Sequence, residues 1–459
     1  AAKQNKHTHV KTKLFKPFFT QTSRLSLLLP AEVLEVLDVV RRHNTWRKFE
    51  CINLIASENA MSPLAKALYV NDMMHRYAEG KPGKRFYQGS IFIDIIETRT
   101  SDLLAKLFNV RFAEVRAISG SVANAIAFRS FASVGDVALV PSLQSGAHIS
   151  HTEFGVLGAL GIKHVEMPFD LDSWNIDVDK AVKLIESIKP RIVVLGASLY
   201  LFPHPTKPIA EAAHSVGARV VHDVAHVLGL IAGGVWPNPV HEGADAATAS
   251  THKTFPGPQG GLILTSREDV YKLVSNNVLT FVSNHHIHRL AATAVTAIEM
   301  MHFGAAYAEQ ITRNARAFAE ELASQGLPVV AEHLGYTKSH IVAIDVRKFG
   351  GGAKIAKLLE EANIIANKNV LPWDRPQDAP NPSGIRFGVQ EMTRFGMKEG
   401  EFKEIAKLIA DIIVRGAEPS SIRRKVVELR KDFVKVHYGF DLPEDLGKKT
   451  IYEFIEMGI

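Results

Sequence analysis

ATASTHKTFPGPQGGLIL, residues Ala247–Leu264, is the stretch from which the fold and the chemistry of this chain are best read. Five small residues come first, and small side chains let a flat or bulky group approach the backbone. Lys253 follows, and the prolines and glycines after it force a loop before a short apolar strand. A lysine held there is partly desolvated, which lowers its pKa and makes its amine a nucleophile. The stretch is typical of a Schiff-base lysine, and an ordinary surface lysine is the alternative.

Short strands and helices alternate around this stretch. The predicted strands are Val137–Pro141, His164–Met167, Ile192–Gly196, Ala218–His222, Ala246–Ser250 and Gly261–Thr265. Helical patterns such as Val178–Ile188 lie between them. This alternation indicates an α/β fold with a mainly parallel sheet covered on both faces, and ligands of such sheets bind at the carboxyl ends of strands. Asp223 and Lys253 both follow such ends.

The 459 residues are enough for two or three domains. We expect a basic N-terminal extension (1–30), a helical arm (31–75), a large domain (76–305), a smaller α+β domain (306–440) and a C-terminal tail (441–459). Predicted helices outside the alternating region are Leu34–Phe49, Pro63–Met74, Ile91–Phe108, His288–Met301, Tyr307–Gly326, Ala353–Ala362, Glu401–Val414 and Ile422–Val436.

Composition narrows the class of protein. The formal charge is +6, but residues 1–30 hold six Lys or Arg and no acid, so the rest is formally neutral and nucleic-acid binding is not expected. No apolar run is long enough to span a membrane. Cys51 is the one cysteine, which excludes an intrachain disulfide and fits a reducing compartment. We expect a cytoplasmic protein, with an organellar leader as the alternative for residues 1–30.

Polar residues gather at the predicted strand ends. Asp223 follows an apolar strand, and a buried carboxylate there needs a cation or a donor. Ser119, Gly120 and Ser121 stand at a predicted helix start, which suits a phosphate, although a plain N-cap is the commoner meaning of such residues. Phosphate cradle, acid and lysine, in that order on one sheet, are the parts that bind pyridoxal 5′-phosphate (PLP).

The chain resembles serine hydroxymethyltransferase, a PLP enzyme of the aspartate-aminotransferase-like fold type I. The resemblance implies a mainly parallel sheet of the seven-stranded type in the large domain. Eight ordered motifs carry the resemblance: LIASEN (54–59), YAEGKPGKRFYQG (77–89), SGSVAN (119–124), GAHISH (146–151), DVAHVLGLIAGG (223–234), STHKT (250–254), NKNVLP (367–372) and SGIRFG (383–388). The resemblance implies a reversible interconversion of serine and glycine, with one-carbon transfer to a reduced pterin.

The same resemblance implies roles for single residues. Lys253 carries the cofactor, Asp223 pairs with its ring nitrogen, His226 lies near its phenolic oxygen and His148 stacks on its ring. The implied phosphate ligands are Ser119, Gly120 and Ser121, with Gly261 reaching in from a neighbouring subunit. Ser198 and His252 are expected close to the cofactor.

The substrate groups follow from the resemblance as well. Arg386 grips the substrate carboxylate, with Ser57 beside it. Tyr77, Glu79 and Tyr87 enter the active site of a partner subunit, where Glu79 is the acid and base near the serine hydroxyl, so a homodimer or a tetramer is implied. Leu143, Ala147, Ile149 and Asn369 match positions that line the pterin site.

Several positions depart from the family pattern. They are Phe86–Gly89, Gln259, the run Ser283-Asn284-His285-His286, where the family usually has paired glycines and a proline, and the run Gly388-Val389-Gln390-Glu391, where it usually has Gly-Thr-Pro-Ala. These departures leave the carrier open between tetrahydrofolate and a modified pterin. A PLP aldolase or transaldolase for threonine-like substrates is the alternative function, and an RNA-binding protein with a vestigial PLP fold is the rival from another class. His285, His286 and His288 lack acidic or cysteine partners at ligand spacing, so no metal site is expected.

Overall fold

The computed structural model describes residues 29–444, and the contacts of the chain divide it after Phe49 into two units. The first unit contains α1 (Ala31–Asn44), which has no buried side chain. A π-helical turn, Thr45–Glu50, follows at the junction. The predicted extension (1–30), with its possible leader, and the predicted tail (441–459) lie mainly outside the described residues.

A seven-stranded sheet forms the core of the second unit, in the order β4-β12-β11-β10-β9-β5-β6. Its strands are β4 (Phe112–Glu114), β5 (Val137–Val140), β6 (Lys163–Glu166), β9 (Ile192–Leu195), β10 (Arg219–Asp223), β11 (Ala246–Ser250) and β12 (Gly261–Thr265). Neighbouring strands are parallel except at β12, which is antiparallel to β11 and β4. The predicted α/β fold with a mainly parallel, seven-stranded sheet is confirmed, and β4 is the strand that is not among the six ranges named from the sequence.

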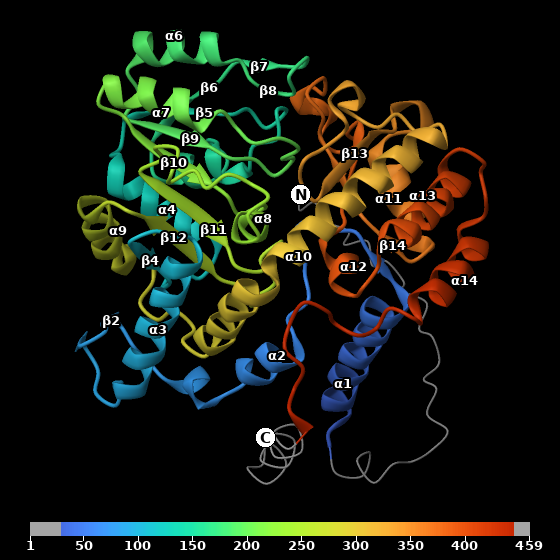
Figure 1. Ribbon diagram of the computed structural model, residues 1–459, viewed down its shortest axis with the longest axis horizontal. Coiled ribbons are helices and arrows are strands. Elements are labelled where there is room, and N and C mark those ends of the chain that lie inside the picture. Colours follow the sequence, from blue (N-terminus) through green and yellow to red (C-terminus); the bar gives the residue numbers. More distant parts are fainter. Residues whose placement is uncertain (1–28, 445–459) are drawn as a thin grey trace, which may run out of the picture. The chain divides into compact units, whose positions relative to one another are not determined.

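Helices cover both faces of this sheet (Figure 1). One face packs against α4 (Gly120–Phe131), α5 (Val156–Ala159) and α9 (Glu268–Phe281). The other packs against α6 (Val178–Ile188), α7 (Thr206–Ser215), α8 (Leu228–Ala232) and α10 (Arg289–Ser324). Along β5, Ala138 and Val140 join the first layer and Leu139 the second, as the two-residue period of a strand requires.

A smaller antiparallel sheet, β13-β16-β15, follows α10. Its elements are β13 (Ile341–Asp345), α11 (Gly352–Glu361), β15 (Asn367–Asn369), β16 (Gly384–Gly388), α12 (Gln390–Arg394), α13 (Glu399–Ile413) and α14 (Pro419–Arg430). The two helices predicted around residue 304 are one 36-residue helix, α10, which runs through the expected domain boundary at residue 305. Gly233, at the end of α8, lets that helix approach α10 closely, because a Cβ on Gly233 would lie 2.4 Å from the Gly304 carbonyl oxygen.

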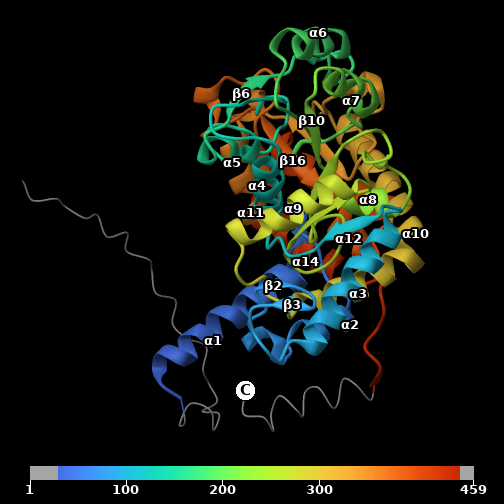
Figure 2. The ribbon, with the colours of Figure 1, turned by 90° about the vertical axis from the view of Figure 1, so that its left-hand side faces the viewer.

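The segment after Phe49 is joined to the smaller sheet region. β1 (Ile52–Asn53) pairs in parallel with β14 (Ile364–Ile365). The remaining elements are α2 (Pro63–Tyr69), a 3₁₀ turn (Asp72–His75), β2 (Gly80–Lys81), β3 (Lys84–Arg85), α3 (Ile91–Leu107), β7 (Phe169–Asp170) and β8 (Asn175–Ile176). Figure 2 shows α2, α3 and the β2–β3 turn at the end opposite to α6 and α7. No helix between residues 29 and 444 is long and apolar enough to cross a membrane.

Candidate active site

The carboxyl ends of the central strands meet around a cavity of about 190 Å³. Its lining brings together nine residues predicted from the sequence, and Ala197, Ala225 and Ser250 complete it. The nine are Ser119, Gly120, Ser121, His148, Ser198, Asp223, His226, His252 and Lys253. Residues from α4 and from the loops after β5, β9, β10 and β11 therefore converge on one site.

The first turn of α4 forms one wall of this cavity. Ser119 is its N-cap, and its hydroxyl accepts from the Val122 N–H. The N-terminus of a twelve-residue helix presents free N–H groups and positive partial charge, which suit a phosphate. A Cβ on Gly120 would lie 2.4 Å from the hydroxyl oxygen of Ser250, so a side chain here would displace that hydroxyl from the cavity wall.

Asp223 is the last residue of β10, and its carboxylate is buried and fully supported. Oδ2 accepts from Asn124 Nδ2 at 2.8 Å and lies 3.1 Å from His151 Nε2, and Oδ1 accepts from the Ala225 N–H at 3.0 Å. Burial opposes ionisation, but the His151 hydrogen bond, the nearby histidines and Asn124 hold the pKa of Asp223 well below its usual range. The site thus keeps a carboxylate ready for a protonated ring nitrogen.

Lys253 follows β11 by three residues and is 9% exposed. Burial lowers the pKa of its amine to about 8, although the charge of Asp223 acts in the opposite direction. Asn59 Nδ2 donates to the Lys253 carbonyl at 2.6 Å and to the Tyr307 hydroxyl at 2.9 Å, which fixes the backbone at the lysine. The nucleophilic lysine expected from the sequence therefore has the environment that such an amine needs.

Histidines complete the walls of the cavity. Burial lowers the pKa of His148 and of His252 to about 4, so both rings are neutral near pH 7. Burial also takes the pKa of His226 well below its usual value, helped by the positive charges of Lys253 and Arg386. His226 stacks on His340, with ring centroids 5.6 Å apart and planes 20° apart.

Arg386 comes from β16 of the smaller sheet and is 8% exposed. Nη1 donates to the carbonyl of Ser198, a cavity residue, at 2.7 Å, and Nε donates to Asn367 Oδ1 at 3.1 Å. No carboxylate pairs with Arg386 among the residues the structure describes, and burial alone lowers the pKa of its guanidinium to about 10. A buried cation without an acid beside it is a site for an anionic ligand.

The loop 76–89, with Tyr77, Glu79 and Tyr87, does not line the cavity of its own chain. Tyr77 and Tyr87 are about half exposed, and their rings meet edge-on at 5.0 Å. Arg85 holds the loop, donating to the carbonyls of Ala78 at 2.8 Å and Gly80 at 2.9 Å.

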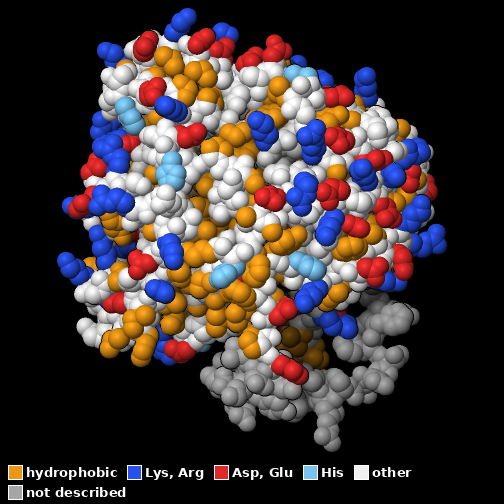
Figure 3. Space-filling model, viewed as in Figure 1, with side chains coloured by type: hydrophobic (Ala, Val, Ile, Leu, Met, Phe, Trp, Pro, Cys, Tyr) orange, Lys and Arg blue, Asp and Glu red, His pale blue; other side chains and the backbone are white. Residues whose placement is uncertain are grey.

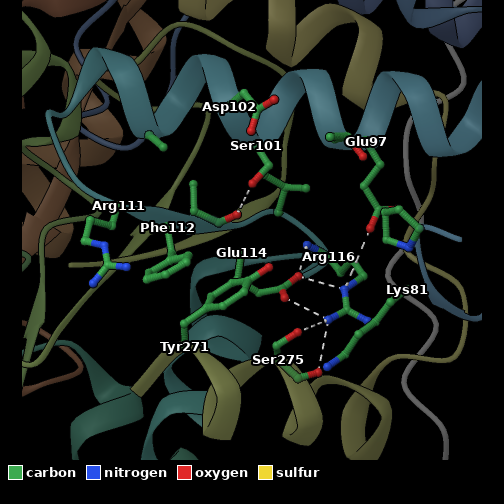
Figure 4. A pocket seen from close by; sticks show the side chains of 15 residues that line it. Lys81, Glu97, Ser101, Asp102, Arg111, Phe112, Glu114, Arg116, Tyr271 and Ser275 are labelled. Atoms are coloured by element: carbon green, nitrogen blue, oxygen red, sulfur yellow. Dashed lines mark hydrogen bonds and ion pairs between the residues drawn. The ribbon is translucent and has the colours of Figure 1, made fainter. Parts of the chain in front are cut away.

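A buried charge cluster lies beneath that loop (Figure 4). Arg116 Nη2 pairs with Glu114 at 2.7 Å, and its Nη1 donates to the Gly80 carbonyl at 3.0 Å. Glu97 pairs with Arg85 at 2.6 Å and with His285 at 2.8 Å. Buried ions are tolerated only when they are paired, so these side chains are held in fixed positions. The loop is fixed with them, because Arg85 belongs to it and Arg116 donates to its Gly80 carbonyl.

The run Ser283–His286, one of the departures from the family pattern, has a structural role here. Besides the contact of His285 with Glu97, Asn284 clamps the loop from both sides of Tyr77. Its Oδ1 accepts from the Ala78 N–H at 3.2 Å, and its Nδ2 donates to the Arg76 carbonyl at 2.9 Å. These residues therefore replace the usual glycine run with side-chain contacts.

The remaining predicted residues lie outside the cavity lining. Ser57 is half-buried on the turn after β1, Leu143, Ala147 and Ile149 lie on the loop after β5, and Asn369 ends β15. Gly261 begins β12, where its N–H donates to the Ala117 carbonyl at 2.8 Å. That N–H is already used within the chain, so the predicted contact of Gly261 with a partner's phosphate cannot use it. The roles of all these residues stay predictions.

Comparison with known proteins identifies the family of this chain. The family model described as "Serine hydroxymethyltransferase" matches residues 29–409. The chain belongs to the serine hydroxymethyltransferase family. A serine hydroxymethyltransferase of Staphylothermus marinus is 61% identical over 92% of this chain and 96% of its own length. One from Aeropyrum pernix is 55% identical over 93% and 97%.

A solved structure of lower identity has the same fold. It is the crystal structure of L-threonine transaldolase from Pseudomonas fluorescens in internal aldimine state, with a TM-score of 0.83. Identity is 27%, over 92% of this chain and 97% of that chain. The fold type predicted from the sequence is thereby confirmed.

The cofactor of serine hydroxymethyltransferases is PLP, and the cavity fits it. The α4 N-terminus suits the phosphate, the supported Asp223 carboxylate suits a ring nitrogen, and Lys253 suits the aldehyde. A further sign is His252 Nδ1, a buried polar atom with no hydrogen-bond partner among residues 29–444. No group of three metal-ligating side chains occurs within residues 29–444.

Sequence reasoning missed the residues that support the cofactor site. Asn124 and His151 hold Asp223, Asn59 holds the Lys253 backbone and His340 stacks on His226. Asn124 could have been found, since it lies one helical turn after Gly120 and so shares its face. His151 and Asn59 end the motifs GAHISH and LIASEN, but their contacts are tertiary, and His340 stands in none of the eight motifs.

Proposed function

We propose that this chain interconverts serine and glycine and transfers the hydroxymethyl carbon of serine to a reduced pterin. The observation that carries the proposal is Arg386, a buried guanidinium without an acidic partner among the described residues. It is bonded to the wall of the cavity that Lys253 and Asp223 line. An amino acid offers both an amine for the cofactor and a carboxylate for this arginine.

Each side chain has one task in this reaction. Lys253 would attach the cofactor through its amine, which a pKa of about 8 leaves partly neutral at cellular pH. Bound PLP withdraws electrons from the substrate Cα, and an ionised Asp223 would keep the ring nitrogen protonated. Arg386 would orient the carboxylate and hence the bond to be broken. Glu79 of a partner subunit would exchange a proton with the serine hydroxyl oxygen.

The pterin site is assigned by resemblance to Leu143, Ala147, Ile149 and Asn369. A serine-to-glycine assay with tetrahydrofolate and with a modified pterin tests both the reaction and the carrier. We expect glycine formation that depends on one of the two pterins and is lost in Lys253→Ala. Cleavage of threonine, together with cleavage of serine that does not depend on a pterin, would instead favour the aldolase alternative. The L-threonine transaldolase with the same fold is the reason to test it.

We also propose a homodimer with shared active sites. Large apolar side chains are exposed on the loop 76–89 and on α3: Phe86 is 67%, Ile91 73%, Phe92 75% and Ile95 58% exposed. Figure 3 shows hydrophobic side chains gathered low on this face, over α2, α3 and the β2–β3 turn. A contiguous apolar surface of this kind marks an interface, and it surrounds the residues that lack a role in their own subunit.

Mixing two inactive variants tests the shared site. Lys253→Ala and Glu79→Gln proteins, unfolded and refolded together, should recover about a quarter of wild-type activity, because half of the dimers are mixed and each mixed dimer has one intact site. No recovery, with mixed dimers present, would mean that Glu79 serves its own subunit. Sedimentation gives the oligomeric state and separates a dimer from a tetramer.

A further inference from the structure

The turn 54–59 is clamped by side chains from the other end of the chain. Gln390 is fully buried at the first position of α12, and both N–H bonds of its amide are used. Nε2 donates to the Ile55 carbonyl at 2.8 Å and to the Glu58 carbonyl at 2.7 Å. The turn between these carbonyls contains Ser57, the residue expected beside Arg386.

The strand with Arg386 grips the same turn. The Gly388 N–H donates to the Leu54 carbonyl at 2.8 Å. A Cβ on Gly388 would lie 2.4 Å from the Cα of Ala56, so backbone meets backbone here. His340 Nε2 lies 3.2 Å from the Ala56 carbonyl oxygen. Only Ser57 lacks such a carbonyl contact among residues 54–58 of the described chain.

Gln390 is also tied to the lysine. Its backbone carbonyl accepts from the Tyr307 hydroxyl at 2.8 Å, and that hydroxyl accepts from Asn59, which donates to the Lys253 carbonyl. The side chain of Gln390 therefore contacts the turn that contains Ser57. Its backbone is connected to Lys253 through Tyr307 and Asn59. It stands four residues after Arg386 on the same segment.

The amide of Gln390 comes with a cost, because its Oε1 is buried without a hydrogen-bond partner in the described residues. A methionine would fill the same space and avoid that cost. Glutamate could not donate to two carbonyls, and asparagine is one methylene too short. The side chain therefore fits a need for two donors at this distance.

We propose that Gln390 is a positioning residue for the substrate carboxylate: it fixes the turn 55–58, and Ser57 with it, in register with Arg386. The proposal rests on the proposed function, in which Arg386 and Ser57 receive the carboxylate. It also gives a reason for one departure from the family pattern, since Gln390 stands where the family usually has proline.

Gln390→Met tests the proposal in the holoenzyme, and Gln310→Met is the matched control. Gln310 is 4% exposed and its amide is bonded to Asn314 and Glu399, away from the cavity. Loss of two donors should raise the KM for serine about tenfold with kcat within about twofold. The control should leave both parameters unchanged. Equal KM values in Gln390→Met and wild type would overturn the proposal.

Two readouts separate positioning from general damage. Glycine and ethanolamine, which lacks the carboxylate, are titrated by the absorbance of bound PLP. Gln390→Met should weaken glycine binding and leave ethanolamine binding unchanged, whereas equal weakening of both would refute the role. In a double-mutant cycle with Ser57→Ala, the two losses should not add, and full additivity would show that Gln390 does not act through Ser57.

A second variant keeps the test sound if Gln390→Met folds poorly. Gln390→Leu keeps a helix-forming residue at the first position of α12, and it also removes both donors. Hydrogen exchange of the cofactor-free protein should rise at residues 54–59 in this variant and stay unchanged in Gln310→Met. Unchanged exchange there would overturn the proposal. Absence of serine cleavage in the wild type would instead refute the proposed function.

Discussion

Replacing Arg386 by methionine is expected to abolish substrate binding and to stabilise the empty protein. Burial lowers the pKa of this guanidinium from 12.5 to about 10, so holding it charged costs about 3 kcal/mol at neutral pH. The pKa of this basic group is lower in the folded protein than in the unfolded chain. The cost in stability is therefore present in full below pH 10, and it falls as the pH rises from about 10 toward 12.5. Methionine removes it and fills a similar volume.

Two hydrogen bonds are lost in the same variant. The Ser198 carbonyl and Asn367 Oδ1 each lose a donor, which costs about 1 kcal/mol apiece. The balance is a gain of about 1 kcal/mol, or roughly 1–2 °C in the melting temperature of a chain of this size. Glycine affinity should fall about a hundredfold or more, because a charge-assisted bidentate pair is lost.

Arg394→Met is the matched control. Arg394 is also fully buried, but it pairs with the buried Glu299 at 3.4 Å and donates to the carbonyls of Ala60 and Tyr438. Its removal leaves a buried carboxylate without its cation and should destabilise by about 3–5 kcal/mol. Melting temperatures of both variants, measured without cofactor, give the comparison. A loss of stability in Arg386→Met like that of the control, or wild-type glycine binding, would refute the reasoning.

Shorter tests concern the cofactor lysine, the support of Asp223, the loop 76–89 and the exposed apolar surface. Attachment of PLP to the cofactor-free protein should accelerate as pH rises through about 8, because the neutral Lys253 amine is the reactive form; a flat stopped-flow profile between pH 6 and 9 would contradict this. Asn124→Leu removes a hydrogen bond that lowers the pKa of Asp223 and should raise that pKa, so acid-induced loss of cofactor absorbance moves to higher pH. Glu79→Gln should keep the cofactor absorbance and lose serine cleavage, and full activity would remove Glu79 from the mechanism. Phe92→Asp places a charge on the exposed apolar surface and should yield inactive monomers in sedimentation; an active dimer would exclude this face as the interface.

Local signals account for the parts of the fold that the sequence predicts. The range of α6, Val178–Ile188, matches the prediction because its ends are encoded locally. Asp177 caps it by accepting from the Lys180 N–H, and Lys189 ends it in the left-handed region. β11 and β12 were likewise predicted with their observed bounds, since a Gly/Pro loop separates two apolar runs.

Tertiary contacts decide the parts that the sequence does not predict. β4 has three residues and no readable period, and it is a strand only because β12 pairs with it. The sequence predicts two helices around Gly304, yet α10 continues through it, and Gly233 at the end of α8 packs against the Gly304 carbonyl. In the site, Lys253, Asp223 and Arg386 stand in motifs that indicate their roles. His151 and Asn59 stand in motifs too, but their supporting contacts form only when distant segments meet.

The contact between Gln390 and the turn 55–58 also bears on how the protein is made. Gln390 follows Ile55 by 335 residues and Glu58 by 332 residues. The turn therefore emerges from the ribosome early, and the glutamine that holds it emerges late. Likewise, β1 cannot pair with β14 until Ile364 and Ile365 have been synthesised. The seven-stranded sheet can form during synthesis, because its strands are complete by Thr265. The carboxylate site can be completed only near the end of translation, so a nascent chain could hold the cofactor before it could hold the substrate.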